Sequence, residues 1–510
     1  MTKPPTKPVT KPKSEELRLR AVNAAPVNPK GTHVLYWMTA ARRTRWNRGL
    51  SRAVHHAKAM RKPLVVLEAL RCGYHWANER IHRFVIDGMA DNAVRFEAAG
   101  VAYVPYVESV PDAGKGLLEA LAERACLVVT DDFPCFFLPR MTSAAGKRLK
   151  VKLEAVDGNG LLPIRATAQP FLTAHDFRRF LQRNLPTHLF VGTEAEPLAK
   201  LDLPRPPAAL KEIADRWRPA RKALLDGDAD LLARVTVDHS VKPVATRGGS
   251  VAGEKAVAKF LKSGLKAYGD DRNDPDAHAT SELSPYLHFG HVSSEEVAHT
   301  LLIQEGCIPS RDLVAAGDGS REGWWHVRPS VEGFLDQLVT WRELGLNLCV
   351  HRPRDYDRYE SLPDWARASL DAHARDPRPQ VYGLAELEAA KTHDEVWNAA
   401  QRQLLSEGRM QNYLRMLWGK KVLQWAKSPR DALDILIHLN NKYALDGRDP
   451  NSYSGIFWTL GRYDRPWAPR RPIFGVIRYM SSENTVKKLR MKDYLARYGA
   501  GPVQGTLGLS

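Results

Sequence analysis

The chain has 510 residues, enough for two or three domains with large hydrophobic cores. Its hydrophobic content of 44% fits a globular protein, and it has no apolar run of the length, about 18 residues, that predicts a membrane-spanning helix. The net charge of +17 points to a polyanionic partner, first of all nucleic acid, with a generally basic surface as the alternative.

The five cysteines are scattered and contain no Cys-x-x-Cys pair. This pattern argues against a zinc site and a disulfide framework, and it fits a reducing compartment. The N-terminus shows no apolar segment typical of a secretory signal. We therefore expect a cytoplasmic protein, associated with the nucleoid in a bacterial cell, with no metal site and no membrane contact.

The first part of the chain divides into two regions. Residues 1–27 begin with the Lys/Pro-rich MTKPPTKPVTKPK and predict a disordered tail. In residues 28–206, strand-like apolar runs alternate with helical periodicity, which predicts an α/β doubly wound domain with a parallel sheet. The strand-like runs are HVLYWM (33–38), KPLVVLEAL (62–70), GVAYVPYV (100–107) and ACLVVTDD (125–132). The region has no G-x-G-x-x-G and no P-loop.

The second part of the chain is predicted to be helical. Residues 207–250 read as a connector, residues 251–500 as an all-α domain, and residues 501–510 as a tail. Ser428 followed by Pro429 is a typical helix start. The segments with a 3.6-residue period are 253–268, 331–349, 392–408, 410–426 and 428–444.

Basic and aromatic residues are interleaved near the C-terminus. Residues 462–497 hold ten Lys or Arg and three Asp or Glu, with tyrosine, tryptophan and phenylalanine among them. Such a surface suits both the phosphates and the bases of nucleic acid.

Tryptophans recur at helical spacing in residues 394–458. Trp418 and Trp425 are two turns apart, so they lie on one helix face, roughly 10 Å apart along the axis. These tryptophans can form a stripe of the hydrophobic core, which is the simpler interpretation, or they can line a site for a flat aromatic ligand. Arg415 and Asp446 could form an ion pair across such a site. The physical pattern alone does not name the ligand.

The block DEVWNAAQRQLLSEGRMQNYLRMLWGKKVLQW…LNNKYALDGRDPNSYSGIFW (394–458) resembles the flavin-binding core of the photolyase/cryptochrome family, specifically the class II deoxyribodipyrimidine photolyases. YGDDRNDPDAHATSELSPYLHFGHVS (268–293) resembles the family's FAD-phosphate segment. WREL (341–344) resembles its active-site Glu motif, and DRPWAPRRPIFGVIRYMS (464–481) its DNA-contacting tail. The resemblance is strong from about 250 to 498 and weaker in the first 200 residues.

The resemblance implies an α/β antenna-type domain followed by an all-α FAD-binding domain. It implies light-dependent repair, in which reduced FAD transfers an electron to a flipped-out cyclobutane pyrimidine dimer and splits it, so that the enzyme is a carbon–carbon lyase. The expected partner is double-stranded DNA containing such dimers, and the expected state is a monomer. A second antenna chromophore of the deazaflavin type is plausible by resemblance, but no motif predicts it.

The resemblance also assigns residues to the cofactor. Asn440 matches the residue that faces flavin N5, where an amide can accept a hydrogen bond. Arg415 and Asp446 match a pair that flanks the isoalloxazine, where a guanidinium favours the reduced anion. The positions that match the diphosphate-binding segment are Tyr268, Ser281, Leu283 and Ser284. The electron-hopping triad is matched by Trp397, Trp418 and Trp425, because indole oxidises readily whereas Phe or Leu would only pack.

Further positions match the family's contacts to damaged DNA. Glu343 matches a carboxylate that contacts the flipped dimer. Met416 and Trp458 match walls of the dimer site, and photolyases are among the named examples of base flipping. Arg465 and Arg478 match residues that enter or flank the bubble left in the duplex.

The chain departs from the family pattern at three places. GRYDR (461–465) is one residue shorter than usual and has Tyr463 for a histidine, Gln411–Asn412 replaces His–Gly, and 306–329 is an insertion. Two other functions stay open: a cryptochrome-like blue-light receptor without repair, and a redox-inert DNA-binding protein. A yellow purified protein would exclude the latter.

Overall fold

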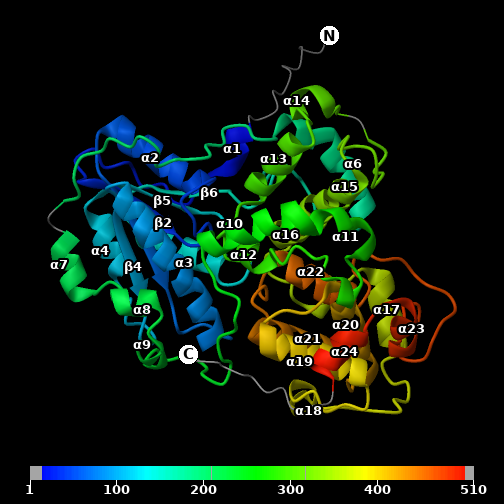
Figure 1. The fold of residues 1–510 in the computed structure, drawn as a ribbon. Helices are drawn as coiled ribbons and strands as arrows, with labels where there is room; N and C mark the ends of the chain where they lie inside the picture. Colours follow the sequence, from blue (N-terminus) through cyan, green and yellow to red (C-terminus); the bar gives the residue numbers. More distant parts are fainter. Residues whose placement is uncertain (1–13, 208–209, 316, 500–510) are drawn as a thin grey trace, which may run out of the picture.

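The computed structural model describes residues 14–207, 210–315 and 317–499. An α/β domain and a helical domain lie side by side, with the sheet on the left of Figure 1 and the later helices on the right. All six strands of the described residues lie before residue 157, and all later elements are helical. The predicted order of an α/β domain followed by an all-α domain is confirmed.

The sheet has the order β1-β6-β5-β2-β3-β4, in which only β1 is antiparallel. The strands are β1 Leu19–Ala21, β2 His33–Met38, β3 Leu64–Leu70, β4 Ala102–Val107, β5 Ala125–Asp131 and β6 Leu153–Val156. Four of them are the predicted apolar runs. The chain moves outward from β2 to β4 and then crosses to β5, so β2 and β5 form the switch point of a doubly wound sheet.

Two hydrophobic cores cover the two faces of this sheet. Val34 and Tyr36 of β2 pack on one face, in the core that also contains Leu50 of α2. Leu35 and Trp37 point to the other face, in the core that contains Leu121 of α4. This alternation buries every residue of β2, which explains its continuous apolar sequence. The helices of this domain are α2 Arg48–Met60, α3 Glu79–Ala98, α4 Leu117–Glu123 and α5 Leu138–Arg148.

The prediction of a disordered tail over residues 1–27 is wrong from residue 14 onward. Residues Ser14–Arg18 form α1, and β1 then pairs with β6 at the sheet edge. Arg18 is buried and donates to the carbonyl oxygens of Gly160 (3.1 Å) and Leu161 (2.6 Å). The apolar content of 14–21 is low, so its order comes from strand pairing and buried hydrogen bonds. Residues 1–13 and 500–510 lie outside the described residues.

The end of the predicted α/β region packs on the helical domain. Helix α6 (Ala174–Asn184) buries Phe177 and Leu181 in a core shared with Phe260 and Phe334. In Figure 1 it lies among α13 and α15, away from the sheet. The connector then forms α7 Leu210–Arg216, α8 Lys222–Asp226 and α9 Ala229–Ala233. The exact boundary between the domains therefore stays a prediction.

The helical domain is built from two large cores. Each predicted helical segment forms a helix, and Ser428 caps α21 by accepting a hydrogen bond from Asp431 N. Two segments contain a π-turn that the 3.6-residue period does not show. The helices and π-turns are α10 Ser250–Lys259, η2 Phe260–Gly264, α11 Leu265–Asp271, α12 Ser284–His288, α13 Ser294–Gln304, α14 Pro309–Asp312, α15 Pro329–Leu335, η4 Asp336–Trp341, α16 Arg342–His351, α17 Asp364–Ala372, α18 Leu384–Glu388, α19 Glu395–Glu407, α20 Asn412–Trp425, α21 Pro429–Tyr443, α22 Pro450–Trp458, α23 Ser482–Lys488 and α24 Lys492–Tyr498.

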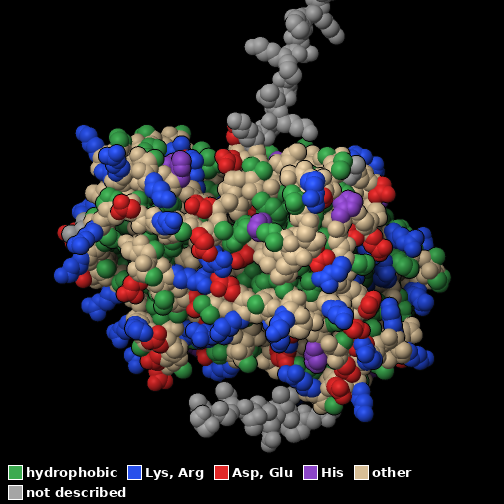
Figure 2. Space-filling model, turned by 45° about the horizontal axis from the view of Figure 1, so that its top comes forward, with side chains coloured by type: hydrophobic (Ala, Val, Ile, Leu, Met, Phe, Trp, Pro, Cys, Tyr) green, Lys and Arg blue, Asp and Glu red, His purple; other side chains and the backbone are tan. Residues whose placement is uncertain are grey.

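The surface is basic without a single dominant patch in the view of Figure 2, where Lys and Arg are spread among Asp and Glu. Among the helices of the described residues, none is long and apolar enough to cross a membrane. In the same residues, no group of three or more His, Cys, Asp or Glu side chains is placed to hold a metal ion.

Candidate functional site

A continuous row of three indoles runs through the helical domain. The rings of Trp418 and Trp397 are parallel within 6°, with centroids 6.3 Å apart, and Trp397 meets Trp425 edge-on at 5.7 Å. Trp397 of α19 thus stands between the two tryptophans that α20 aligns. All three are at most 2% exposed, so the row is enclosed by the core. The structure brings the predicted triad together in the order 418, 397, 425.

Hydrogen bonds fix the orientation of two of these indoles. Trp397 donates through Nε1 to the carbonyl oxygen of Trp418 at 3.0 Å. Trp418 donates through Nε1 to Gln401 Oε1, also at 3.0 Å. Each buried N–H therefore has a partner, and the rings cannot turn without losing it. Such fixed, touching indoles can pass an electron from one to the next.

The outer end of the row meets two residues that the sequence analysis did not single out. Tyr382 and His393 both contact Trp425, each with ring centroids 5.4 Å from it. Both lie in loops of the structure: Tyr382 is outside the predicted helices, and His393 falls just before α19, in the predicted helical segment 392–408 that assigned it no role. Only the packing of these loops against α20 reveals them.

An ion pair stands near the start of α20. Arg415 donates from both terminal nitrogens to Asp446, at 3.2 and 3.1 Å. The side chains are 23% and 12% exposed, so the pair is mostly desolvated. Burial alone would raise the pKa of Asp446, but the Arg415 charge and hydrogen bonds from Arg415 and Ser284 hold that pKa below its usual value. The predicted pair exists, and Ser284 is drawn to it.

Asn440 lies on α21, just before the turn that carries Asp446. Its amide nitrogen donates to Ser452 Oγ at 2.7 Å and to Asn441 Oδ1 at 3.2 Å. With both N–H groups used, the carbonyl oxygen is the atom that remains to accept a hydrogen bond. The turn is tight: a Cβ on Gly447 would stand 2.7 Å from the backbone carbonyl oxygen of Asn440.

The predicted diphosphate segment divides into two environments. Ser281 Oγ accepts a hydrogen bond from Leu283 N at 3.5 Å, and Ser284 begins α12. Tyr268, in contrast, packs edge-on against Phe334 at 5.3 Å, and burial raises its pKa to about 12. The structure therefore places Ser284 with the ion pair and Tyr268 in the hydrophobic core.

The structure gives Glu343 buried backbone partners, and its predicted contact with a base stays a prediction. Glu343 is 3% exposed, and its oxygens accept hydrogen bonds from Leu161 N at 2.6 Å and Leu162 N at 3.0 Å. A Cβ on Gly160 would stand 2.6 Å from the same carboxyl group. Burial raises the pKa of Glu343 to about 7, although the two N–H donors and the charges of Arg342 and Arg18 lower it. This carboxyl joins α16 to the segment that leaves the sheet.

A Glu343→Ala variant is expected to unfold at lower urea concentration. It leaves two buried N–H groups without acceptors, each of which costs about 1–3 kcal/mol. Urea titration measures the free energy of unfolding, and Glu360→Ala, in an exposed ion pair with Arg430, is the matched control. A variant of normal stability that selectively loses affinity for dimer-containing DNA would support the substrate role of Glu343.

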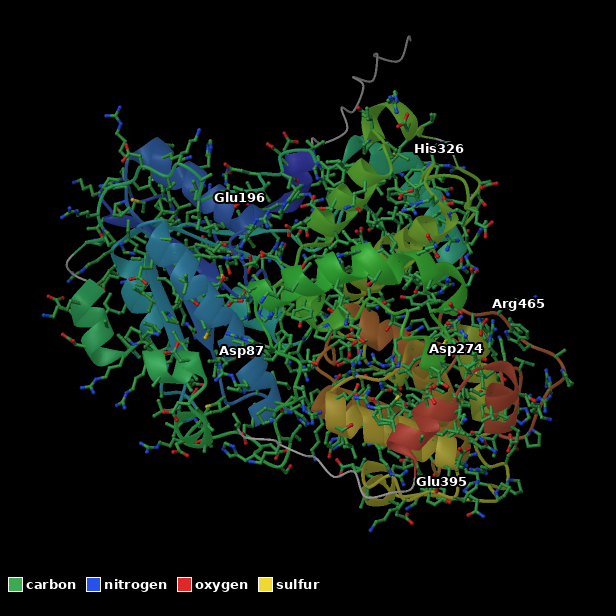
Figure 3. All side chains as sticks on the ribbon, in the orientation of Figure 1. Asp87, Glu196, Asp274, His326, Glu395 and Arg465 are labelled. Carbon is green, nitrogen blue, oxygen red and sulfur yellow. The ribbon has the colours of Figure 1, made fainter. Side chains whose placement is uncertain are left out.

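The predicted DNA-contacting residues differ in exposure. Met416 and Trp458 are half-buried, and Arg465 is exposed on the loop at the right of Figure 3. Arg478 instead donates to both oxygens of Asp464, at 2.8 and 3.0 Å. Its guanidinium also lies 3.9 Å from the ring centroid of Trp467, so it is a support of the loop more than a free cation.

The three departures from the family pattern have defined places in the structure. Gln411 caps α20 by accepting a hydrogen bond from Leu414 N, and it donates to the carbonyl oxygen of Arg272 at the end of α11. Tyr463 is 8% exposed, in a left-handed conformation with φ of 63°. The inserted segment is held on α6, where Gly319 N donates to Gln182 at 2.9 Å.

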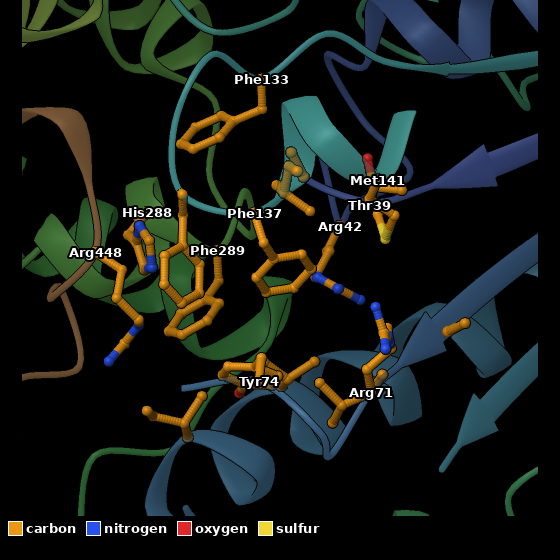
Figure 4. A pocket seen from close by; sticks show the side chains of 17 residues that line it. Thr39, Arg42, Arg71, Tyr74, Phe133, Phe137, Met141, His288, Phe289 and Arg448 are labelled. Carbon is orange, nitrogen blue, oxygen red and sulfur yellow. The ribbon is translucent and has the colours of Figure 1, made fainter. Parts of the chain in front are cut away.

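An aromatic cavity of about 90 Å³ lies at the carboxyl ends of β2 and β3, against the helical domain (Figure 4). Five phenylalanine and tyrosine rings line it together with three arginines. These residues are Tyr74, Phe133, Phe136, Phe137, Phe289, Arg42, Arg71 and Arg448. Tyr74 also lines an adjoining open cleft of about 400 Å³.

Together, the fold and the site define a two-domain protein: a doubly wound sheet joined to a helical domain that holds an indole row beside a desolvated ion pair. No protein-family model matches the chain. It is 32% identical over 482 residues to a deoxyribodipyrimidine photo-lyase of Methanothermobacter thermautotrophicus, covering 94% of this chain and 97% of the relative. A deoxyribodipyrimidine photo-lyase of Oryza sativa is also 32% identical, over 94% of this chain and 90% of its own. The chain belongs to the deoxyribodipyrimidine photo-lyase family.

A solved structure agrees with this fold. A bacterial class III photolyase from Agrobacterium tumefaciens has a TM-score of 0.63 and covers 92% of this chain and 86% of its own, at 18% identity. At that identity the likeness concerns the fold alone.

Proposed function

We propose that this protein repairs cyclobutane pyrimidine dimers in DNA in a light-dependent reaction, as a carbon–carbon lyase of the class II type with FAD as its cofactor. The observation that carries the proposal is the enclosed row of Trp418, Trp397 and Trp425. Membership in the photo-lyase family and the net charge of +17 support it. A monomer that acts on cytoplasmic or nucleoid DNA is part of the same proposal.

The residues near the ion pair fit a flavin. Bound FAD would supply, in its reduced and light-excited form, the electron that splits the dimer. Arg415 would favour a negative charge on the ring, and Asp446 would hold the guanidinium in place. The free carbonyl oxygen of Asn440 can accept the hydrogen on N5. Ser281, Leu283 and Ser284 would lie along the diphosphate.

The tryptophan row gives this site a path for electrons. Phenylalanine or leucine would fill the same volume, but neither oxidises as readily as indole. In the proposed function, the row lets an electron travel from the outer side of the domain to the cofactor, which keeps the cofactor in its reduced state. Because the three indoles are buried, each transfer takes place away from water and without large reorganisation.

Damaged DNA would meet the half-buried Met416 and Trp458. Trp458 offers a flat face for an extruded base, and two basic side chains lie near it: Lys420 Nζ lies 4.8 Å and Arg478 Cζ 5.5 Å from its centroid. Arg465 is an exposed cation of the neighbouring loop, as are Arg470 and Arg471, and we propose that it enters the gap left by the dimer. The basic segment 462–497 would contact phosphates.

We expect Arg465→Ala to weaken binding to dimer-containing DNA by on the order of tenfold, and binding to undamaged duplex much less. The reason is that a gap exists only where the dimer has left the stack, and unpairing costs a few kcal/mol. Arg478→Ala is expected to weaken both DNAs alike, because it disturbs the loop through Asp464. Titration of both variants against both DNAs at several salt concentrations measures this. Equal losses for Arg465→Ala would make that residue a phosphate contact.

The aromatic cavity is our candidate site for a second, deazaflavin-type chromophore. Its arginines and rings suit a flat, anionic ring system. The volume of about 90 Å³ is below the roughly 300 Å³ of an ordinary ligand pocket, so the ring would need Tyr74 to turn toward the adjoining cleft. The absorbance spectrum of the purified protein would show such a chromophore beside the flavin.

The alternative is a blue-light receptor with the same flavin and indole row but no repair. Illumination of the purified, reduced protein with dimer-containing DNA, followed by counting of the dimers, separates the two. A light-dependent fall in dimer number, absent in the dark, supports repair. An unchanged dimer number in a protein that binds flavin and is photoreduced would favour the receptor.

A further inference from the structure

The tryptophan row ends before it reaches water. Trp425, its outermost indole, is 2% exposed. Tyr382 and His393 cover it: Tyr382 is half-buried, and His393 is exposed. Both rings meet the indole nearly edge-on, at interplanar angles of 81° and 65°. An electron that enters the row from outside therefore passes through these two residues or through nonpolar packing.

The phenol of Tyr382 is hydrogen-bonded in a way that prepares it to lose a proton. Its hydroxyl lies 2.7 Å from Nδ1 of His393, and the backbone N–H of His393 donates to the phenol oxygen at 3.0 Å. In the tautomer of His393 that carries its proton on Nε2, the phenolic O–H donates to Nδ1 while the phenol oxygen accepts the backbone bond. The backbone N–H of Tyr382 donates to the carbonyl oxygen of Trp425 at 3.3 Å, which keeps phenol and indole together.

The local charges disfavour a positive charge that stays on Trp425. Lys421 Nζ lies 5.5 Å from the ring centroid of Trp425. A cation at this distance raises the energy of an oxidised, positively charged indole. Asp394, 3.1 Å from Lys421, offsets part of this effect. Transfer of an electron from Tyr382 to Trp425, with the proton passing to His393, moves the positive charge from the buried indole to the exposed imidazole, where water screens it from Lys421.

We propose that Tyr382 and His393 form the terminal electron donor of the row, with His393 as the proton acceptor. The inference rests on the proposed function, which oxidises the row. In the step, the Trp425 radical cation takes one electron from Tyr382, and the phenolic proton moves to His393 Nδ1. The products are a neutral indole, a neutral tyrosyl radical and an imidazolium. The exposed side of the pair is then open to an external thiol, which returns the electron.

The test is a flash experiment on the purified full-length protein that locates the radical by absorbance and EPR. Wild type is expected to give a neutral tyrosyl radical, and Tyr382→Phe a tryptophan radical only. In His393→Phe the tyrosyl yield should fall on the order of tenfold, since the phenol loses its acceptor. In His393→Gly, added imidazole should restore it. Tyr443→Phe, which removes a hydroxyl bound to Glu388, is the matched control and should behave as wild type.

A flavin-independent arm keeps this test separate from the proposed function. A flash-excited ruthenium complex with persulfate oxidises the protein without bound flavin. If Tyr382→Phe lowers the tyrosyl signal in this arm while illumination of wild type neither reduces a flavin nor repairs dimers, the Tyr382–His393 pair stands and the proposed function fails. A tyrosyl radical of normal yield in Tyr382→Phe, or an unchanged yield in His393→Phe, overturns the pair.

Discussion

A Trp418→Phe variant should keep its flavin and lose photoreduction of the oxidised flavin. The parallel contact of 6.3 Å between Trp418 and Trp397 is the first step of the row, and phenylalanine does not oxidise under the same conditions. The fold should survive, because phenylalanine fills most of the indole volume. The missing hydrogen bond to Gln401 costs about 1 kcal/mol. Absorbance under continuous light measures the reaction.

Two further measurements define this result. Repair by chemically pre-reduced Trp418→Phe should stay near wild type, because the row only supplies the reduced cofactor. Trp325→Phe replaces another buried indole of the helical domain, 6% exposed and outside the row, and should be photoreduced normally. Normal photoreduction of Trp418→Phe would show that electrons reach the cofactor by another route.

Asp446→Ala is expected to lose most of its flavin. Removing one partner of a largely desolvated ion pair leaves Arg415 without its countercharge, a cost on the order of 3 kcal/mol. The guanidinium also loses the two hydrogen bonds that orient it. Flavin content per protein after gel filtration measures the effect. Glu360→Gln removes the charge from an exposed ion pair and should keep its flavin.

The same pair predicts a pH dependence. The folded pKa of Asp446 lies below the ordinary 3.8 of an aspartate, so folded Asp446 holds its proton less tightly than the unfolded chain does. Its contribution to stability is therefore complete above about pH 4 and disappears as the pH falls through the folded pKa. Wild type should retain flavin at pH 5 and release it well below pH 4. Full flavin content in Asp446→Asn would show that hydrogen bonding, without the charge, suffices.

Periodicity and composition determined much of the fold without any tertiary information. The four apolar runs of the α/β domain became β2 to β5. The central strands β2, β3 and β5 are buried on both faces, which requires apolar residues at nearly every position, whereas the edge strand β4 is only partly buried. The strands β1 and β6, of three and four residues, were missed, since so short a segment carries no readable period. The π-turns at 260–264 and 336–341 were missed for the same reason.

In the candidate site, the sequence alone determined the residue types and the helices that carry them, including Trp418 and Trp425 on one face of α20. Tertiary structure decided that Trp397 stands between them and that Arg415 pairs with Asp446. It also decided that the side-chain oxygen of Asn440 stays free to accept a hydrogen bond. It also gave Glu343 a buried link with the segment after β6, while its contact with a base stays a prediction. Spacing along the sequence predicts which residues share a helix or a strand. Contacts between elements depend on how their faces pack, and the row and its outer pair are contacts of that kind.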